Sequence, residues 1–295
     1  MNAYYSEEFL ADAVSSVLEQ SMQDWEIILW ENVSTSAKNV VDNLDDSRIR
    51  YFHTPDKVSL YESRVSALSQ AQGEFLAFLD CDDVWLPDKL RSQLGVFDNE
   101  ECVISCSDYF VFRGGHLQAN WREQVEIVET YRSVRRSPIE VALDYRVGMS
   151  TVIIRKQAVD RIWSGSVPEY SIIEDFDMVV RLLSRGWLIP VPEPLSVYRK
   201  HGSNFSNRLD VEADEWMHWI NHEDALVMEP DCRVQIYETM SERLLRLQIR
   251  QARLDGNRAE SWRMLGRLPW GPFKIKYLIS YLLPTKWVCR WATRI

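Results

Sequence analysis

The sequence has few cysteines and no long apolar run. Its five cysteines, in 295 residues, show neither paired spacing nor a Cys-x-x-Cys pair, so we expect free thiols in a reducing compartment. No apolar run approaches the ~20 residues that a membrane-spanning helix needs, and the first residues do not form a signal-peptide pattern. These absences predict a cytoplasmic protein that is either soluble or bound to the inner face of the cell membrane.

Basic side chains are in deficit overall, and acids are missing from one end. The chain has 34 Lys and Arg against 44 Asp and Glu, a net charge of −10, which argues against nucleic acid as a partner. Residues 263–295 contain seven basic residues and no acid, interleaved with aromatic residues such as Trp270 and Trp287. This pattern predicts peripheral contact with an anionic membrane, with packing on the acidic remainder of the chain as the alternative.

The most informative stretch is an apolar run that leads into three carboxylates. Residues 75–79 suit a strand buried on both faces of a parallel sheet, and Asp80, Asp82 and Asp83 follow it. Open α/β sheets bind ligands at the carboxyl ends of such strands. Carboxylates this close repel one another unless a cation shares their charge, and hard oxygen ligands suit Mg²⁺ or Mn²⁺. The pattern predicts a metal site, with a solvated acidic turn as the alternative.

Two chemistries use an Asp-x-Asp at a strand end. In phosphatases of the haloacid-dehalogenase type the first Asp is a nucleophile and the second a general acid, and Asp80 and Asp82 fit that pattern. In nucleotide-sugar transferases the acids hold a metal against a diphosphate. The flanks closely resemble the signature of glycosyltransferase family 2: Gly73, Glu74, Phe78, Leu79, Trp85, Pro87, Lys89 and Leu90. The phosphatase motif normally opens its domain, whereas about seventy residues precede this one.

Strand and helix patterns alternate along the first part of the chain. The strand patterns are 25–30, 49–53 and 75–79, and the helical patterns are 6–18, 34–44 and 60–71. This alternation predicts a doubly wound, mostly parallel α/β sheet, and the resemblance implies the GT-A, Rossmann-like form of it. We expect a catalytic domain over residues 1–207. Residues 208–295 show no strand pattern and are predicted to form a helical C-terminal region.

The chain departs from the family pattern in two places. Family members begin with a buried strand, and Asn2 stands where that strand ends, so we expect the first strand to be absent and the natural start to lie upstream. After the second strand the family has an Asp that contacts the nucleotide base, and Glu31 stands there instead. Glu31 can still accept a hydrogen bond from a base. Val33 replaces a glycine and disfavours a positive φ at that position.

The resemblance implies a binding site for a nucleotide-diphosphate sugar. Arg64 matches an arginine near the nucleotide's phosphates, and Arg199 and His201 belong to a Tyr-Arg-x-His segment that folds over the diphosphate. The implied ligands of a Mn²⁺ or Mg²⁺ ion are Asp82, Asp80 and His201. The implied nucleotide-sugar contacts are Glu31, Arg64, Asp80, Asp83 and Arg199.

A second acidic pair begins the helical pattern at 172–186. Glu174 and Asp175 fall in its first turn, where acids also favour the helix dipole. The pair resembles the family's Glu-Asp motif, which implies that Asp175 is the catalytic base, with Glu174 beside it. The implied reaction is an inverting transfer of the sugar to a surface-polysaccharide or lipid-linked glycan acceptor. The alternative is a degenerate relative that keeps the fold as a non-catalytic binding or scaffold protein.

Overall fold

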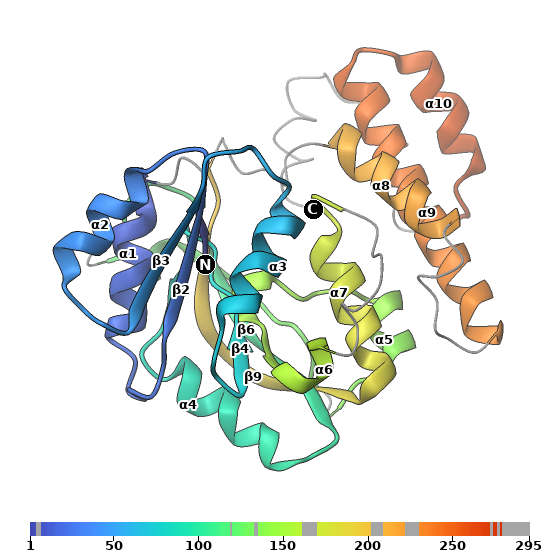
Figure 1. The fold of residues 1–295 in the computed structure, drawn as a ribbon. Coiled ribbons are helices and arrows are strands. Elements are labelled where there is room, and N and C mark those ends of the chain that lie inside the picture. The colour runs from blue at the N-terminus through green and yellow to red at the C-terminus, as the bar shows by residue number, and fades with distance from the viewer. Residues whose placement is uncertain are drawn as a thin grey trace.

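The first half of the chain builds a small parallel sheet. The computed structural model describes residues 1–3, 7–118, 120–132, 135–160, 170–201, 209–221, 230–271, 274–275 and 278. Strands β1 (Asn2–Ala3), β2 (Ile27–Asn32) and β3 (Ile49–Thr54) pair in parallel in the order β1-β2-β3. Helices α1 (Glu7–Leu18) and α2 (Ser36–Leu44) lie on one side of this sheet, and α3 (Leu60–Gln70) lies on the other (Figure 1).

The first strand is present, although it is short. β1 has two residues, and the Met1 ammonium group donates to the Ile28 carbonyl at 2.9 Å while Trp30 N donates to the Met1 carbonyl at 3.0 Å. The expectation of a missing first strand is therefore corrected to a two-residue strand that extends the parallel ladder. Its far side faces the acidic loop, where the Cys81 thiol donates to the Asn2 carbonyl at 3.1 Å.

The second sheet is mixed. Its strands are β4 (Phe75–Ala77), β5 (Val84–Trp85), β6 (Cys102–Phe112), β7 (Val125–Val128), β8 (Ile153–Arg155) and β9 (Trp187–Arg199). They are ordered β4-β8-β6-β9-β5, and β7 pairs with β6. Only β6 and β9 are parallel; the other pairs between the described strands are antiparallel. The predicted α/β class is confirmed, but the mostly parallel pairing is limited to β1–β3 and the β6–β9 pair.

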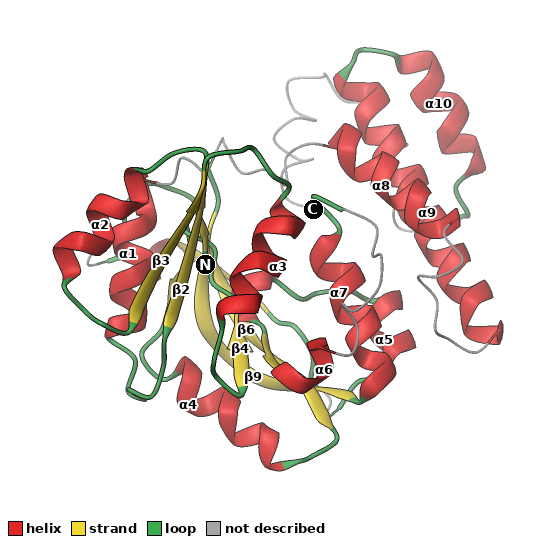
Figure 2. Cartoon of the chain, viewed as in Figure 1, coloured by secondary structure: helices red, strands yellow, loops and turns green. Residues whose placement is uncertain are grey.

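The remaining helices cover this second sheet and extend from it (Figure 2). They are α4 (Lys89–Leu94), α5 (Pro138–Leu143), α6 (Lys156–Asp160), α7 (Glu174–Leu182), α8 (Leu209–Asn221), α9 (Pro230–Leu254) and α10 (Arg258–Arg267). Local sequence sets several of their ends. Both α3 and α5 begin with a capping box, formed by Ser59 with Glu62 and by Ser137 with Glu140. Short 3₁₀ helices span Gly95–Asp98, Trp121–Gln124, Met149–Thr151 and Leu183–Arg185.

Three apolar clusters hold the layers together. One lies on the α1, α2 and α4 side of the sheets, and a second lies between the second sheet and α5, α6 and α7. A third joins α7 to the C-terminal helices, with Phe176 of α7 packed edge-on against Trp216 and Trp219 of α8. The C-terminal helices are thus packed directly on the helix that begins with the Glu-Asp pair.

No helix among the described residues combines the length and apolar character needed to cross a bilayer. The longest, α9, has 25 residues, but charged side chains recur along it. Cys81, Cys102 and Cys106 are buried free thiols, as expected. Burial raises the pKa of Cys102 to about 11 and that of Cys106 to about 12, so both are thiols at neutral pH.

Candidate active site

Arg64 connects the two acidic motifs. Its guanidinium group, on α3, is 6% exposed; Nη2 lies 3.3 Å from Asp80 Oδ1, and Nη1 lies 3.1 Å from Glu174 Oε2. Asp80 follows β4 and Glu174 begins α7, so one buried cation brings together two segments that are far apart in the sequence. A buried guanidinium needs a carboxylate partner, because a buried charge without one is costly.

The acids at the start of α7 have raised pKa values. Burial raises the pKa of Glu174 to about 7, even though Arg64 opposes the shift. Burial also raises the pKa of Asp175 to about 6, against a 2.7 Å hydrogen bond from the Phe176 amide. The Tyr145 phenol faces Asp175, and its own pKa is raised by burial and by that carboxylate. A carboxylate with a pKa near 6 is suited to act as a base near neutral pH.

Asp82 and His201 form the part of the site that could hold a metal ion. Asp82 Oδ2 lies 2.9 Å from His201 Nε2, and both side chains are partly exposed. Burial, together with the neighbouring Asp80, raises the pKa of Asp82, and the hydrogen bond with His201 opposes the shift. A carboxylate and an imidazole fit Mn²⁺, with diphosphate oxygens and waters as the further ligands.

Asp80 does not join that pair in the structure. Among the described residues, no group of three His, Cys, Asp or Glu side chains is close enough to hold an ion. Asp80 is turned toward Arg64 instead, and its amide donates to Ser150 Oγ at 3.1 Å. Of the three ligands named from the sequence, Asp82 and His201 therefore contact each other, whereas Asp80 contacts Arg64.

Asp83 is buried, and its carboxylate is hydrogen-bonded within the protein. It is 2% exposed; Oδ1 accepts from the Arg199 amide at 2.9 Å, and Oδ2 accepts from Ser150 Oγ at 2.5 Å. Burial and the neighbouring Asp82 raise its pKa well above the usual range. Both oxygens are used to tie the acidic loop to β9 and to the turn before β8. Ser150 was missed in the sequence, where one Ser after Gly148-Met carries no signal of its own.

Arg199 also stabilises the acidic loop, because its side chain is buried and bonded to that loop. Its guanidinium group is 1% exposed: Nε donates to the Asp82 carbonyl at 2.7 Å, Nη1 donates to the Gly115 carbonyl, and Nη2 lies 3.1 Å from Asp12 Oδ2. The guanidinium carbon lies 4.2 Å from the centre of the Phe9 ring. In this arrangement Arg199 fixes the backbone that carries Asp82.

Glu31 is fully buried at the end of β2. Its carboxylate accepts hydrogen bonds from the Ser34 and Ser36 hydroxyls, from Tyr51 Oη at 2.8 Å and from the Ala37 amide at 3.1 Å. Burial alone would raise the pKa of Glu31, but these hydrogen bonds outweigh it, so the pKa is lowered. Glu31 therefore caps α2, whose N-cap side chain makes no capping bond.

Val33 adopts the conformation that the sequence disfavours. Its φ is 66°, in the left-handed region, and its amide donates to the Thr54 carbonyl at 2.9 Å. This backbone costs a non-glycine residue about 1–2 kcal/mol. A β-branched residue held there indicates that the surrounding contacts determine the loop after β2.

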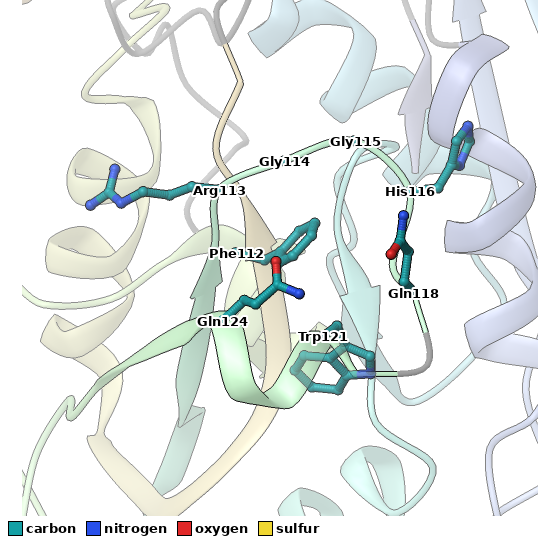
Figure 3. A pocket seen from close by; sticks show the side chains of 8 residues that line it. All are labelled: Phe112, Arg113, Gly114, Gly115, His116, Gln118, Trp121 and Gln124. Atoms are coloured by element: carbon teal, nitrogen blue, oxygen red, sulfur yellow. The ribbon is translucent and has the colours of Figure 1, made fainter.

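A cavity of about 350 Å³ lies beyond Arg199, at the tip of the β6–β7 hairpin (Figure 3). Phe112, Gly115 and Trp121 line it. Phe112 and Tyr109 point to opposite faces of β6, because side chains alternate along a strand. The Tyr109 phenol is on the side of Asp175, where burial and nearby carboxylates raise its pKa to about 12. Gly115 of the lining accepts from Arg199, which also donates to the Asp82 carbonyl, so the cavity adjoins the residues that support the acidic loop.

Two relatives resemble much of the chain. TuaG of Bacillus subtilis, named for teichuronic acid biosynthesis, is 26% identical over 219 residues, which cover 72% of this chain and 83% of TuaG. The UDP-Glc:alpha-D-GlcNAc-diphosphoundecaprenol beta-1,3-glucosyltransferase WfaP of Escherichia coli is 27% identical over 186 residues, which cover 62% of this chain and 68% of WfaP.

Solved structures share the fold. Residues 1–349 of Staphylococcus aureus TarS, in complex with UDP-GlcNAc, superpose with a TM-score of 0.64 at 14% identity, covering 91% of this chain and 80% of that one. The mannosyltransferase PcManGT of Pyrobaculum calidifontis, in complex with GDP-Man and Mn²⁺, gives a TM-score of 0.62 at 11% identity, with coverage of 95% and 78%. At these identities the likeness establishes the fold, which is GT-A.

The sequence profile of glycosyl transferase family 2 matches residues 1–162, more than half of the chain. The match includes Arg64 and the acidic loop after β4. The chain belongs to glycosyltransferase family 2 and is a glycosyltransferase.

Proposed function

We propose that this enzyme is a metal-dependent, inverting glycosyltransferase that takes a sugar from a nucleotide-diphosphate donor. The observation that carries the proposal is the Arg64 bridge, which holds Asp80 and Glu174 on either side of one buried cation. It brings the acidic loop next to the proposed base, Asp175. We assign the catalytic role to residues 1–207 and treat the helices after it as their support.

The names of the relatives support the choice of substrates. WfaP uses UDP-Glc and a diphosphoundecaprenol-linked GlcNAc acceptor by its name, and TuaG is named for a wall polymer. The TarS structure holds UDP-GlcNAc. By extension, we propose a UDP-sugar donor and a lipid-linked glycan or surface polysaccharide as acceptor for this chain.

Asp175 acts as the general base in the proposed mechanism. It takes the proton of the acceptor hydroxyl while that oxygen attacks the anomeric carbon from the side opposite the departing diphosphate, so the configuration inverts. Burial holds the pKa of Asp175 at about 6, and the hydrogen bond from the Tyr145 phenol keeps that pKa from rising further. Glu174 fixes Arg64, whose cation then lies close enough to attract the donor's phosphates.

Asp82 and His201 would hold the Mn²⁺ or Mg²⁺ ion, while Asp80 stays paired with Arg64. When bound, the ion supplies positive charge to the departing diphosphate. Asp83 and Arg199 have a supporting role: they fix the loop and the end of β9, so that Asp82 and His201 face each other. Glu31 shapes the wall at the end of β2 by capping α2.

Calorimetric titration of UDP tests this assignment. With excess Mn²⁺ we expect binding to wild type, and after metal removal we expect it to weaken by at least about a hundredfold, or 2.7 kcal/mol. Asp82→Ala should weaken UDP binding similarly in the presence of Mn²⁺. The control is Asp88→Ala, which removes an exposed carboxylate of the same loop whose Oδ1 accepts from Ser21 Oγ at 2.7 Å. Equal UDP affinity with and without metal would refute the metal site.

The aromatic, basic surface at the C-terminal end supports a peripheral membrane contact, which we also propose. Trp262 and Trp270 are 54% and 78% exposed, and Lys274 Nζ lies 5.0 Å from the Trp270 ring centre. Arg263 and Arg267, both on α10, lie between them in the sequence. Aromatic rings with basic neighbours suit the headgroup region of an anionic bilayer, where the lipid-linked acceptor would lie. Residues 272–273, 276–277 and 279–295, which belong to the same sequence pattern, lie outside the described residues.

Vesicle flotation tests the membrane contact. Wild type should float with phosphatidylglycerol vesicles at low salt and much less with phosphatidylcholine vesicles, because charge and apolar burial act together. Replacing Trp262 and Trp270 with serine should lower the bound fraction several-fold. Ile127→Ser is the matched control, since Ile127 is 56% exposed on β7. Equal flotation of the double variant and the control would contradict the contact.

A further inference from the structure

Glu215 of α8 is bonded to the turn that leads into α7. Its Oε1 accepts from the Ser171 amide at 2.7 Å, and its Oε2 accepts from the Ile172 amide at 2.8 Å and the Ile173 amide at 3.1 Å. Three consecutive backbone N–H groups thus converge on one carboxylate. The residue providing it lies in the C-terminal helices, beyond the part of the chain that the family profile matches.

The start of α7 has no cap of its own. Ile173 occupies the N-cap position and makes no side-chain capping bond, so the first N–H groups need partners from elsewhere. Acids follow in the first turn, and Asp175 Oδ1 satisfies only the adjacent Phe176 amide. The Glu215 carboxylate supplies the missing acceptors just ahead of the helix, where a negative charge is favoured by the helix dipole.

A second contact fixes the same two helices. Trp219 Nε1 donates to Asp177 Oδ1 at 2.9 Å, and Asp177 Oδ2 lies 2.8 Å from Arg181 Nε. The Trp219 and Trp216 rings are fully buried against Phe176, with ring centres at 5.0 and 4.7 Å. These contacts set the distance between α8 and α7, while the Glu215 bonds set how the chain enters α7. Asp175, in the first turn, lies two residues after Ile173, whose amide is the last of the three bound by Glu215.

We propose that Glu215 is a positioning residue for catalysis: by binding the amides of Ser171, Ile172 and Ile173, it fixes the orientation of Asp175 toward the acceptor hydroxyl. The inference rests on the proposed role of Asp175 as the base. It gives the C-terminal helices a part in turnover in addition to any membrane contact. A misplacement of a base by about 1 Å can cost a hundredfold in rate, so a loosened turn should lower kcat.

Glu215→Gln is the informative substitution. Glutamine keeps the length of the side chain but has one acceptor oxygen, and its amide group would face an N–H donor. At least one of the three bonds is lost, while the buried Trp219 contact remains. Asp214→Asn is the matched control, because Asp214 is the exposed neighbour on the same helix. Melting temperatures and UDP binding in the presence of Mn²⁺ verify that both variants are folded.

Hydrogen exchange tests, independently of activity, whether the Glu215 carboxylate holds the three amides, a contact we call the clamp. In the full-length protein, the amides of Ser171, Ile172 and Ile173 should exchange at least about tenfold faster in Glu215→Gln than in wild type, and at the wild-type rate in Asp214→Asn. Unchanged exchange at these three amides in Glu215→Gln would overturn the inference.

Kinetics test the positioning role. With UDP-glucose as the donor, diphosphoundecaprenol-linked GlcNAc as the acceptor and UDP release as the readout, Glu215→Gln should lower kcat about tenfold and leave the donor KM within about twofold, because the donor contacts lie on other elements. A wild-type kcat, or a loss of UDP binding in step with kcat, would contradict positioning. A wild type without turnover, or an Asp175→Asn variant with full turnover, would instead contradict the proposed function, and the exchange result would still decide whether the clamp exists.

Discussion

Asp175→Asn is expected to lower kcat by about a thousandfold while UDP binding in the presence of Mn²⁺ stays near the wild-type value. A positioned general base contributes about 10²–10⁴ in rate, and asparagine fills the same space without accepting the proton. The donor contacts proposed for Asp82 and Arg64 do not involve this side chain. Steady-state kinetics of UDP release from UDP-glucose, together with UDP titration, measures both quantities.

The pH profile separates the two acids at the start of α7. The pKa of Asp175 is raised to about 6, so wild-type kcat should fall up to tenfold per pH unit as the pH drops below about 6, where the base becomes protonated. Glu174→Gln should keep this acid limb, because Asp175 remains, whereas Asp175→Asn should lose it. If Asp175→Asn retains the limb and Glu174→Gln loses it, the base is Glu174.

Arg64→Met is expected to lower the free energy of unfolding by about 3–5 kcal/mol at neutral pH. The substitution removes the cation between Glu174 and Asp80, so a buried carboxylate is left without its partner. Arg50→Met is the control: Arg50 Nη1 lies 3.0 Å from Glu26 Oε2 near the surface, where a pair is worth about 1 kcal/mol or less. Urea unfolding of the three proteins gives the comparison.

The loss in free energy of unfolding caused by Arg64→Met should become smaller as the pH falls. Glu174 has a folded-state pKa of about 7, above its unfolded value, and loss of Arg64 raises it further. The folded state therefore binds more protons than the unfolded state, and stability decreases as the pH rises through this range. The deficit should therefore be larger at pH 8 than at pH 5, by about 1 kcal/mol. A deficit no larger than that of Arg50→Met at both values would mean that the bridge contributes little.

Local patterns in the sequence were enough to predict most of the elements in the first half. The strand predicted over 49–53 matches β3 to within one residue, and the helix predicted over 60–71 matches α3 to within one residue. These segments have strong signals: β-branched and aromatic residues in β3, and helical spacing with a capping box in α3. The C-terminal helices were also found, because no strand pattern competes there.

Pairing in the second sheet could not be read from the sequence. β9 contains Pro190, Pro192 and Pro194, which argue against a central strand because proline cannot donate to the ladder. The structure accommodates these prolines because the pairing register of β9 against β6 shifts near Ser107 and Asp108, in the middle of β6. Antiparallel partners such as β4 and β8 are joined by long connections that leave no local signal.

For the site residues too, motifs predicted which residues take part, but not which contacts they make. Motifs predicted that Asp82, Glu174 and Arg64 belong to one site; in the structure Arg64 lies between Glu174 and Asp80, two residues before Asp82. Glu31 and Arg199 were assigned to the donor by position in a motif, but the structure uses their charges to cap α2 and to hold the acidic loop. Sequence spacing cannot say whether a charged group faces a ligand or its own backbone. Glu215 lacked any motif and became visible only through its three bonds to the turn before α7.

The most direct test of the account is a crystal structure of the protein with UDP and Mn²⁺, with the metal located by its anomalous scattering. We predict one strong anomalous peak within coordination distance of Asp82 and His201, touching the diphosphate, with Arg64 on the phosphate side and Asp175 facing the space where the sugar would lie. A diphosphate bound elsewhere, or a peak away from Asp82, would contradict the proposed donor site and the mechanism built on it.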